Sequence, residues 1–311
     1  MNLFLRNMEI AATQVLILYV MIFVGFLCCK AKIFTEKAAK LSTDLLFYII
    51  TVSVIINSFL SMEFTKDSAE QFLISLLCNT ATFVIPIVLT FPLFKKEKDE
   101  RNPIFKFASV YSNCGYMALP LAQAILGDEG VFYCSTGVIV FNILCFTHGV
   151  KLMTREKFKF GLKKLILNPG TLGVLIGLPL FITGIKLPEI LAKPISSFAA
   201  MNTPLAMLMF GAYLANTDLK TMFSEKKVYP TAFIKLIAIP LVCIGLYRIC
   251  GVSGTLLTAC AITAASPSAN NTIMFSAKYD RDTGTASKTV ALVSFISIFT
   301  IPVMVALSES I

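Results

Sequence analysis

Charged residues are scarce in this chain of 311 residues: they make up 14% of it, whereas hydrophobic residues make up 56%. Soluble proteins carry about 25% charged residues. A soluble fold must cover its surface with side chains that tolerate water, and this composition supplies too few of them. The shortage of charge therefore excludes an ordinary soluble fold and indicates a protein whose apolar surface faces a lipid bilayer.

Histidine and closely paired cysteines are also lacking. The chain has one histidine, and none of its nine cysteines forms a CxxC pair. A Cys/His zinc site needs several such ligands at short spacing. An enzyme inside the membrane would need paired acids, a nucleophile with a base, or a metal cluster at depth, and the sequence shows none of these. We therefore expect no metal, no cofactor and no enzymatic activity, and we interpret the cysteines as small buried hydrophobic residues.

The apolar residues are gathered in long windows. A helix needs about 20 mainly apolar residues to cross the hydrocarbon core of a bilayer. Continuous runs favour helices over a β-barrel, whose strands are short and alternate in polarity. We expect an all-α polytopic membrane protein, with the first run as a membrane helix and not a signal sequence. Ten windows predict ten transmembrane helices, and only the window 228–247 contains a charge, Lys235: 10–29, 45–62, 71–94, 107–127, 130–150, 165–185, 195–217, 228–247, 249–277 and 289–308.

The net charge of +9 comes from the loops between these windows. Lys and Arg number 21 in the odd-numbered loops and 5 in the other loops and the termini. Cytoplasmic loops of membrane proteins are enriched in Lys and Arg. The basic balance thus predicts a multi-pass protein of the cell membrane with both termini outside the cytoplasm, and it argues against nucleic-acid binding.

The predicted helices recur at a fixed spacing. Starts near 10, 41, 71, 107 and 130 are followed by starts near 165, 196, 228, 260 and 286, an offset close to 155 residues. Five is an odd number, so a second set of five helices enters the membrane from the opposite side. We interpret residues 1–155 and 156–311 as an inverted repeat. Ten even helices that look periodic by chance are the alternative, but the irregular fourth helix recurs as the ninth.

The fourth and ninth windows have polar centres that include a proline, in the stretches 108–120 and 261–272. Proline removes a backbone donor and clashes with the preceding helical turn. Backbone groups freed in this way cannot face lipid, so they must face protein or a water-filled cavity. The two stretches therefore predict a pair of broken helices, held open by Pro120 and Pro267, around a shared polar cavity at mid-membrane.

Each predicted break exposes the N-terminus of the half-helix that follows it. Because the two helices are antiparallel, the two positive dipole ends approach each other, and a carboxylate suits such a site. Helix kinking for packing alone is the alternative. The predicted substrate-binding residues are Asn113, Gly115, Tyr116, Asn142, Ser266, Ser268, Asn270 and Asn271.

Three further residues are candidates for a coupling or charge role. Lys235 is the one formal charge well inside a window. It either reaches back to the cytoplasmic surface or supplies a fixed positive charge at depth. His148 could titrate near neutrality, although a bond to backbone at a helix interface is the commoner use. Asp44 begins the second window, where a charge at the helix start beside Lys40 is the simpler interpretation.

Asn57, Asn202 and Thr203 lie in the second and seventh windows. They either line the wall of a transport pathway or form hydrogen bonds between packed helices. No Asp or Glu lies at mid-membrane, so the sequence shows no evident cation site. Proton coupling, sodium coupling and uniport all remain open.

Several stretches of the chain resemble one family. The polar centre of the ninth window, Ala265-Ser266-Pro267-Ser268-Ala269-Asn270, followed by Tyr279-Asp280, is similar to the ninth-helix signature of the auxin efflux carrier family, which includes plant PIN carriers and bacterial organic-acid permeases. The resemblance covers essentially the whole chain. Its other parts are Asn113 to Pro120, Leu121-Ala122, Gly127-Asp128-Glu129-Gly130 and Val140-Phe141-Asn142.

The resemblance implies two inverted five-helix repeats, similar to bile-acid-type sodium symporters and NhaA. Helices 1, 2, 6 and 7 would form a scaffold that dimerises, and helices 3–5 and 8–10 a transport domain that moves as an elevator. The fourth and ninth helices would cross at their breaks. The crossover asparagines of the family match Asn113 and Asn270, and its crossover prolines match Pro120 and Pro267.

The sequence therefore predicts a secondary transporter for a small organic anion, such as a malate-like or malonate-like dicarboxylate or an auxin-like acid. Its expected partners are this anion, the lipid bilayer and a second copy of the chain. The alternatives are a membrane sensor that binds a ligand without moving it and a sodium-coupled symporter of the bile-acid type.

Overall fold

The computed structural model describes residues 3–93, 100–154, 169–215 and 219–311. This part of the chain is helical, apart from turns and an isolated antiparallel bridge between Ser112 and Ser268. Helices satisfy their own backbone groups, as a bilayer requires. Among the described residues, six helical stretches are long and apolar enough to cross a membrane: Lys37–Leu60, Lys66–Leu93, Cys114–Met153, Glu189–Ala215, Val228–Ile249 and Thr283–Ser310. Shorter apolar helices are Leu16–Lys30, Pro169–Thr183 and Gly254–Ala265.

The first half of the chain contains seven α-helices and three π-helical segments among the residues described. In chain order they are α1 (Leu3–Lys30), α2 (Glu36–Leu45), η1 (Leu46–Thr51), α3 (Val52–Leu60), α4 (Lys66–Leu93), α5 (Asn102–Val110), η2 (Cys114–Ala118), α6 (Leu119–Leu144), η3 (Cys145–Gly149) and α7 (Val150–Met153). The segments α2, η1 and α3 follow one another without a gap. Gly127, with φ 67° and ψ −154°, interrupts α6.

The second half is built from similar pieces. Its described elements are α9 (Pro169–Thr183), α10 (Glu189–Ala200), α11 (Asn202–Ala215), α12 (Leu219–Met222), α13 (Val228–Phe233), η4 (Ile234–Ala238), α14 (Ile239–Ile249), α15 (Gly254–Ala265), α16 (Asn271–Lys278) and α17 (Thr283–Ser310). The π-helical η4 joins α13 and α14 into one apolar stretch.

Two breaks interrupt the helices where the sequence has its polar centres. Between α5 and η2 the chain is extended at Tyr111, with φ −93° and ψ 111°. Between α15 and α16 it is extended at Ser266, with φ −60° and ψ 142°. The breaks lie against each other: Asn113 N–H donates to the Pro267 carbonyl at 2.8 Å, and Ala269 N–H donates to the Tyr111 carbonyl at 2.9 Å. The expectation that both helices are broken, and that they meet at their breaks, is confirmed.

Pro120 does not lie at a break. It stands near the start of α6, which continues directly from η2, whereas the extended residues end at Asn113. The fixed φ of proline is close to the helical value, so proline fits near the beginning of a helix. The break before η2 is held by the backbone bonds to the other segment, and the expectation that Pro120 holds it open is wrong. Pro267 does lie in the second break.

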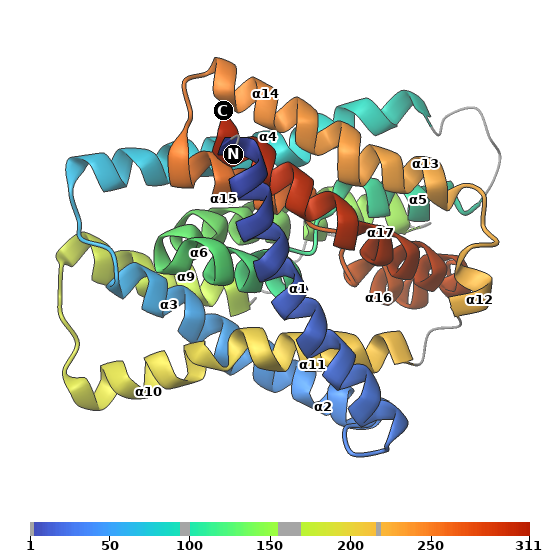
Figure 1. Cartoon of the computed structure of the whole chain (residues 1–311), viewed down its shortest axis with the longest axis horizontal. Coiled ribbons are helices and arrows are strands. Elements are labelled where there is room, and N and C mark those ends of the chain that lie inside the picture. Colours follow the sequence, from blue (N-terminus) through green and yellow to red (C-terminus); the bar gives the residue numbers. More distant parts are fainter. Residues whose placement is uncertain (1–2, 94–99, 155–168, 216–218) are drawn as a thin grey trace.

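The helices form two groups on opposite sides of the protein, with α15 buried among its neighbours. In the view of Figure 1, α2, α3, α10 and α11 run along the lower side, and α4, α5, α13 and α14 along the upper side. Helix α1 packs against α11, and α3 packs against α9 and α10. Helix α15 packs against α4, α6, α14 and α17 and is buried on nearly all sides. The breaks next to α15 therefore lie deep inside the protein.

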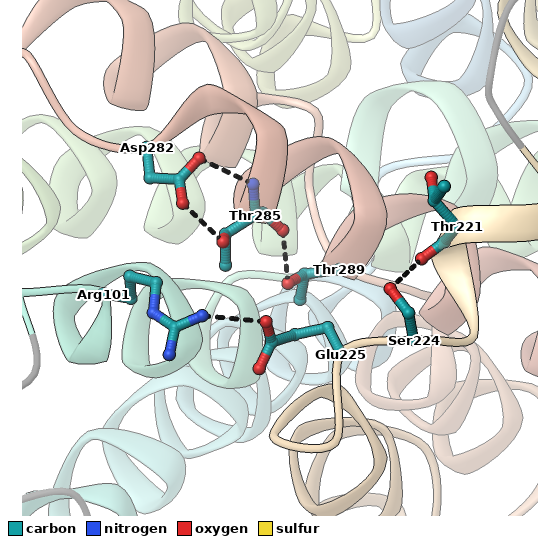
Figure 2. A network of polar contacts seen from close by, with 7 residues as sticks. All are labelled: Arg101, Thr221, Ser224, Glu225, Asp282, Thr285 and Thr289. Carbon is teal, nitrogen blue, oxygen red and sulfur yellow. Dashed lines mark hydrogen bonds and ion pairs between the residues drawn. The ribbon is translucent and has the colours of Figure 1, made fainter.

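Separate polar contacts stabilise the starts of α5 and α17 (Figure 2). Arg101, at the start of α5, forms a 2.8 Å ion pair with Glu225 in the turn before α13. Asp282 caps α17 by accepting from the Thr285 N–H at 2.9 Å and the Thr285 hydroxyl at 2.7 Å. These two bonds hold the pKa of the Asp282 carboxyl below its usual value. The ion pair ties the start of α5 to the turn before α13, and the Asp282 cap stabilises the start of α17.

Glycines allow the closest helix contacts, and one of them gives a direct test of the packing. A Cβ on Gly211 in α11 would lie 2.0 Å from the Ile22 carbonyl of α1. Because the obstacle is backbone, the Gly211→Ala variant should lose about 1–3 kcal/mol of stability, the usual cost of overpacking. A fluorescence melt of the purified protein in detergent measures the loss as a lower Tm.

Gly245→Ala in α14 is the matched control, since a Cβ there meets no described atom within 4 Å. Equal melting temperatures for the two variants would contradict the α1–α11 packing described above.

Candidate functional site

The crossing of the two breaks brings four helix ends together. The half-helices α5 and α15 end there, and η2 and α16 begin there. The last turn of a helix has carbonyls without a partner, and the first turn has N–H groups without one. The helix dipole makes the carbonyl ends negative and the N–H ends positive. The chemistry of the crossing therefore depends on what caps each kind of end.

The carbonyl ends are capped by two different side chains. The Ser268 hydroxyl donates to the Ala108 carbonyl of α5 at 2.7 Å. The Lys235 Nζ donates to the Ala264 carbonyl of α15 at 3.0 Å and to the Ser112 Oγ at 2.5 Å. Lys235 is 1% exposed, so it does not reach back to the membrane surface. The burial argues against the first of the two interpretations of Lys235, and the role of a fixed positive charge at depth stays a prediction.

The N–H ends are less completely capped. The Asn113 Oδ1 accepts from the Tyr116 N–H at 3.2 Å, but its Nδ2 has no hydrogen-bond partner among the described residues, although the side chain is only 3% exposed. The fully buried Thr272 Oγ1, in the first turn of α16, also has no partner in the described part of the chain. A buried polar group without a partner costs about 1–3 kcal/mol. Both groups can donate to a ligand.

Space is present beside these donors. A Cβ built on Gly115 would meet no atom of the described structure within 4 Å. Gly115, Asn270 and Asn271 are partly exposed, unlike the buried residues of the breaks themselves. Asn270 precedes α16 but makes no capping bond there within the described structure, and the Asn271 Nδ2 lies 3.9 Å from the Cys145 Sγ. Open space thus adjoins the N–H ends of η2 and α16.

The other predicted binding residues lie at different places. The Ser266 hydroxyl donates to the Ile262 carbonyl at 2.8 Å, within its own helix. Asn142 is buried in α6. Tyr116 is half-buried and bonds to Thr43, whose Oγ1 lies 3.0 Å from the Tyr213 hydroxyl. Tyr116 therefore lies where η2 faces α2 and α11. Their contact with substrate stays a prediction.

His148 and Asp44 do not match their expected surroundings. The Nδ1 of His148 lies 2.9 Å from the Tyr111 hydroxyl, which donates to the Leu144 carbonyl at 2.8 Å. The partner of His148 is thus a side chain in the first break and not the backbone. Asp44 is exposed and lies in the last turn of α2, which begins at Glu36, so it is not a charge at a helix start.

Thr272 and Asn79 were not singled out from the sequence, whereas Asn202 was. Thr272 belongs to the polar stretch of the ninth window, and its burial without a partner could be known only from the structure. Asn79 in α4 donates from Nδ2 to the Thr136 Oγ1 at 2.9 Å. Asn202 in α11 is 1% exposed, and neither of its amide atoms has a partner among the described residues. A role for Asn202 in hydrogen-bonded helix packing is therefore not what the structure shows.

Two cavities lie away from the crossing. One of ≈ 490 Å³ is bordered by α3, α9 and α10, and one of ≈ 460 Å³ by α4, α14 and α15. No group of three or more His, Cys, Asp or Glu in the described residues could hold a metal ion. The crossing itself brings together four helix ends and two donors that lack a partner among the described residues, next to Gly115, whose Cβ position is open.

The comparisons with known proteins agree with a membrane protein of this kind. Residues 10–305 match the family described as membrane transport protein. The chain is also similar to the uncharacterized transporter MJ1031 of Methanocaldococcus jannaschii, with 23% identity over 300 residues that cover 92% of this chain and 95% of the relative. Since the match spans nearly the whole sequence, the chain belongs to the membrane transport protein family, the family of the auxin efflux carriers that its sequence resembles.

Proposed function

We propose that this protein is a secondary transporter that binds a small organic anion at the crossing of its two broken helices. The observation that carries the proposal is the buried Asn113 amide, whose Nδ2 lacks a partner in the described structure beside the N-terminal ends of η2 and α16. A carboxylate would accept from this amide and satisfy it. The family supports transport, and the geometry of the crossing supports the class of substrate.

The charges at the crossing favour an anion over a cation. The helix ends that border the open space at Gly115 are positive ends, and the Asn113 Nδ2, which lacks a partner among the described residues, is a donor. The charged side chain that bonds within the crossing is the cationic Lys235. A bound cation would meet like charge, whereas a carboxylate would meet donors and positive dipole ends.

Several equivalent contacts support ten spans in two inverted repeats. The stretch Cys114–Met153 has 40 residues, which is enough for two spans, and Gly127 divides it. Ala108 in the last turn of α5 and Ser112 in the first break correspond to Ala264 in the last turn of α15 and Ser268 in the second break, both at an offset of 156 residues. The first span packs on the seventh through Gly25, which lies against Leu208. In the same way, the sixth span packs on the second through Gly173 and Gly177, which lie against Ile55 and Phe59.

The same pairing suggests how the substrate is moved. Spans 1, 2, 6 and 7 contact one another through α1–α11, α3–α9 and α3–α10 and would form the scaffold. The broken helices and their neighbours would move against it, with the substrate held at the crossing. Tyr116, Thr43 and Tyr213 would lie at the boundary between the two bodies. Both termini would lie outside the cytoplasm, and the scaffold helices would join two copies of the chain.

Replacing Asn113 tests the site directly. Asn113→Asp keeps the shape and the oxygen that caps Tyr116, but it removes the donor and adds a negative charge. We expect the variant to fold and to lose most anion uptake, because like charges repel at short range. Asn113→Ala and Asn270→Ala should also abolish uptake into proteoliposomes. Unchanged uptake in properly folded variants would rule out the crossing as the substrate site.

Filling the space at Gly115 provides an independent test. Gly115→Leu adds a side chain whose Cβ meets no described atom within 4 Å, and we expect the variant to fold while substrate binding is blocked. Gly245→Leu, at another glycine with no described atom within reach, is the control and should transport normally. If the two variants transport equally well, the space beside the N–H ends is not the binding site.

Ligand-induced stabilisation tests the substrate class. Carboxylates such as malonate, malate or an aryl acetate should raise the Tm of the purified protein, because a ligand that binds the folded state stabilises it. The corresponding amides have similar size and no charge, and they should raise the Tm little. Equal stabilisation by acids and amides would contradict the argument from positive helix ends.

A further inference from the structure

Lys235 lies where the correspondence between the two halves fails. At the end of α5, the Ser268 hydroxyl of the second half donates directly to the Ala108 carbonyl of the first half at 2.7 Å. The equivalent pair at the end of α15 is Ser112 of the first half and Ala264 of the second, and here the Lys235 Nζ stands between the two, at 2.5 Å from Ser112 Oγ and 3.0 Å from the Ala264 carbonyl. An ammonium has therefore been inserted into one of two matching helix caps.

No such charge is present at the matching position of the first half. The residue 156 positions before Lys235 is Asn79, a neutral amide that bonds to Thr136 in α6 and not to the crossing. Repetition of the five-helix unit thus does not account for the lysine. The sequence around it also forms η4, a π-helical segment, and such segments often occur at functional sites.

The surroundings of Lys235 compensate its charge only in part. The side chain is 1% exposed, and within the described chain no carboxylate lies at ion-pair distance from it. Its acceptors are a hydroxyl and a carbonyl at the C-terminal end of α15, which carries about half a negative charge from the helix dipole. A buried charge without a full counter-charge is costly, and in membrane proteins it usually has a function.

We propose that Lys235 is a tethered cation whose charge is balanced by the transported anion. The argument rests on the proposed function, because it places the anion at the N–H ends of the same crossing. Ser112, which accepts from Lys235, is followed directly by Asn113 with its unpartnered Nδ2. The ammonium bridges the two acceptors on the carbonyl side of the crossing. It makes the crossing net positive when no substrate is bound and close to neutral when a monocarboxylate is bound. Lys235 is a positioning and charge-balancing residue, and it need not touch the substrate.

The tethered-cation part can be tested without any substrate. Lys235→Ala leaves a space between Ser112 Oγ and the Ala264 carbonyl that a free alkylammonium ion can enter. Methylammonium chloride should therefore raise the Tm of Lys235→Ala, relative to tetramethylammonium chloride at equal ionic strength, which cannot donate hydrogen bonds. Wild-type protein and Lys226→Ala, at an exposed lysine before α13, should respond equally to the two salts. Lack of a specific methylammonium effect on Lys235→Ala would overturn the proposal.

The charge-balancing part is tested by anion titrations of the same proteins. Lys235→Met, which fills the space without a charge, should bind the stabilising carboxylate about tenfold more weakly or worse than wild type, given the strength of charge interactions in a buried site. Methylammonium should restore affinity to Lys235→Ala but not to Lys235→Met, an effect that a merely structural role would not produce. If Lys235→Ala folds only when methylammonium is present, that result supports the proposal that Lys235 is a tethered cation. The anion titration of this variant is then made in methylammonium chloride.

The two proposals fail in different ways. If wild-type protein binds no organic anion, the proposed function is wrong, and the methylammonium effect on Lys235→Ala still decides whether the lysine is a tethered cation. If wild type and Lys235→Met bind the anion equally well, the substrate assignment stands and charge balancing by Lys235 is overturned.

Discussion

The structure depends on a pair of backbone hydrogen bonds between two interrupted helices. Asn113 N–H bonds to the Pro267 carbonyl, and Ala269 N–H bonds to the Tyr111 carbonyl. Inside a bilayer, extended backbone cannot turn to water, so a single interrupted helix would leave these groups unpaired. Each break satisfies the other, and neither would be stable alone. The surrounding helices α4, α6, α14 and α17, which pack on α15, keep the two segments in place and away from lipid.

Pairing the breaks in this way creates a polar site from backbone alone. Four helix ends lie close together at the crossing. The partial charges of their dipoles do not cancel, because the carbonyl ends and the N–H ends are bonded to different groups. Ser268 and Lys235 cap the carbonyl ends, while the Asn113 amide at the N–H ends has a donor that lacks a described partner. The carbonyl ends of the site thus have hydrogen-bond donors, whereas a donor at the N–H ends lacks an acceptor. A bound anion would supply that acceptor.

Lys235 gives a charge to one of two matching helix caps, while the other cap is neutral. Ser112 and Ala264 repeat the pair of Ser268 and Ala108, yet only one pair has an ammonium between its members. A single substitution on a neighbouring helix can therefore give a nearly symmetric crossing a permanent charge. The two halves can keep the same backbone while the electrostatics of the site depend on one side chain.

The sequence by itself determined that the chain is a membrane protein of apolar helices, and that its fourth and ninth windows are interrupted, because hydrophobic length and clustered polar residues are local properties. It also indicated Asn113, Asn270 and Pro267 as residues at the breaks. Only the tertiary structure decided that Pro120 lies inside a helix, that Ser266 bonds within its own helix, and that Lys235 reaches the crossing from another helix. The breaks are held by backbone bonds between residues more than 100 positions apart, and the Lys235 side chain bonds to Ser112 across 123 positions, so no local pattern encodes which groups become partners.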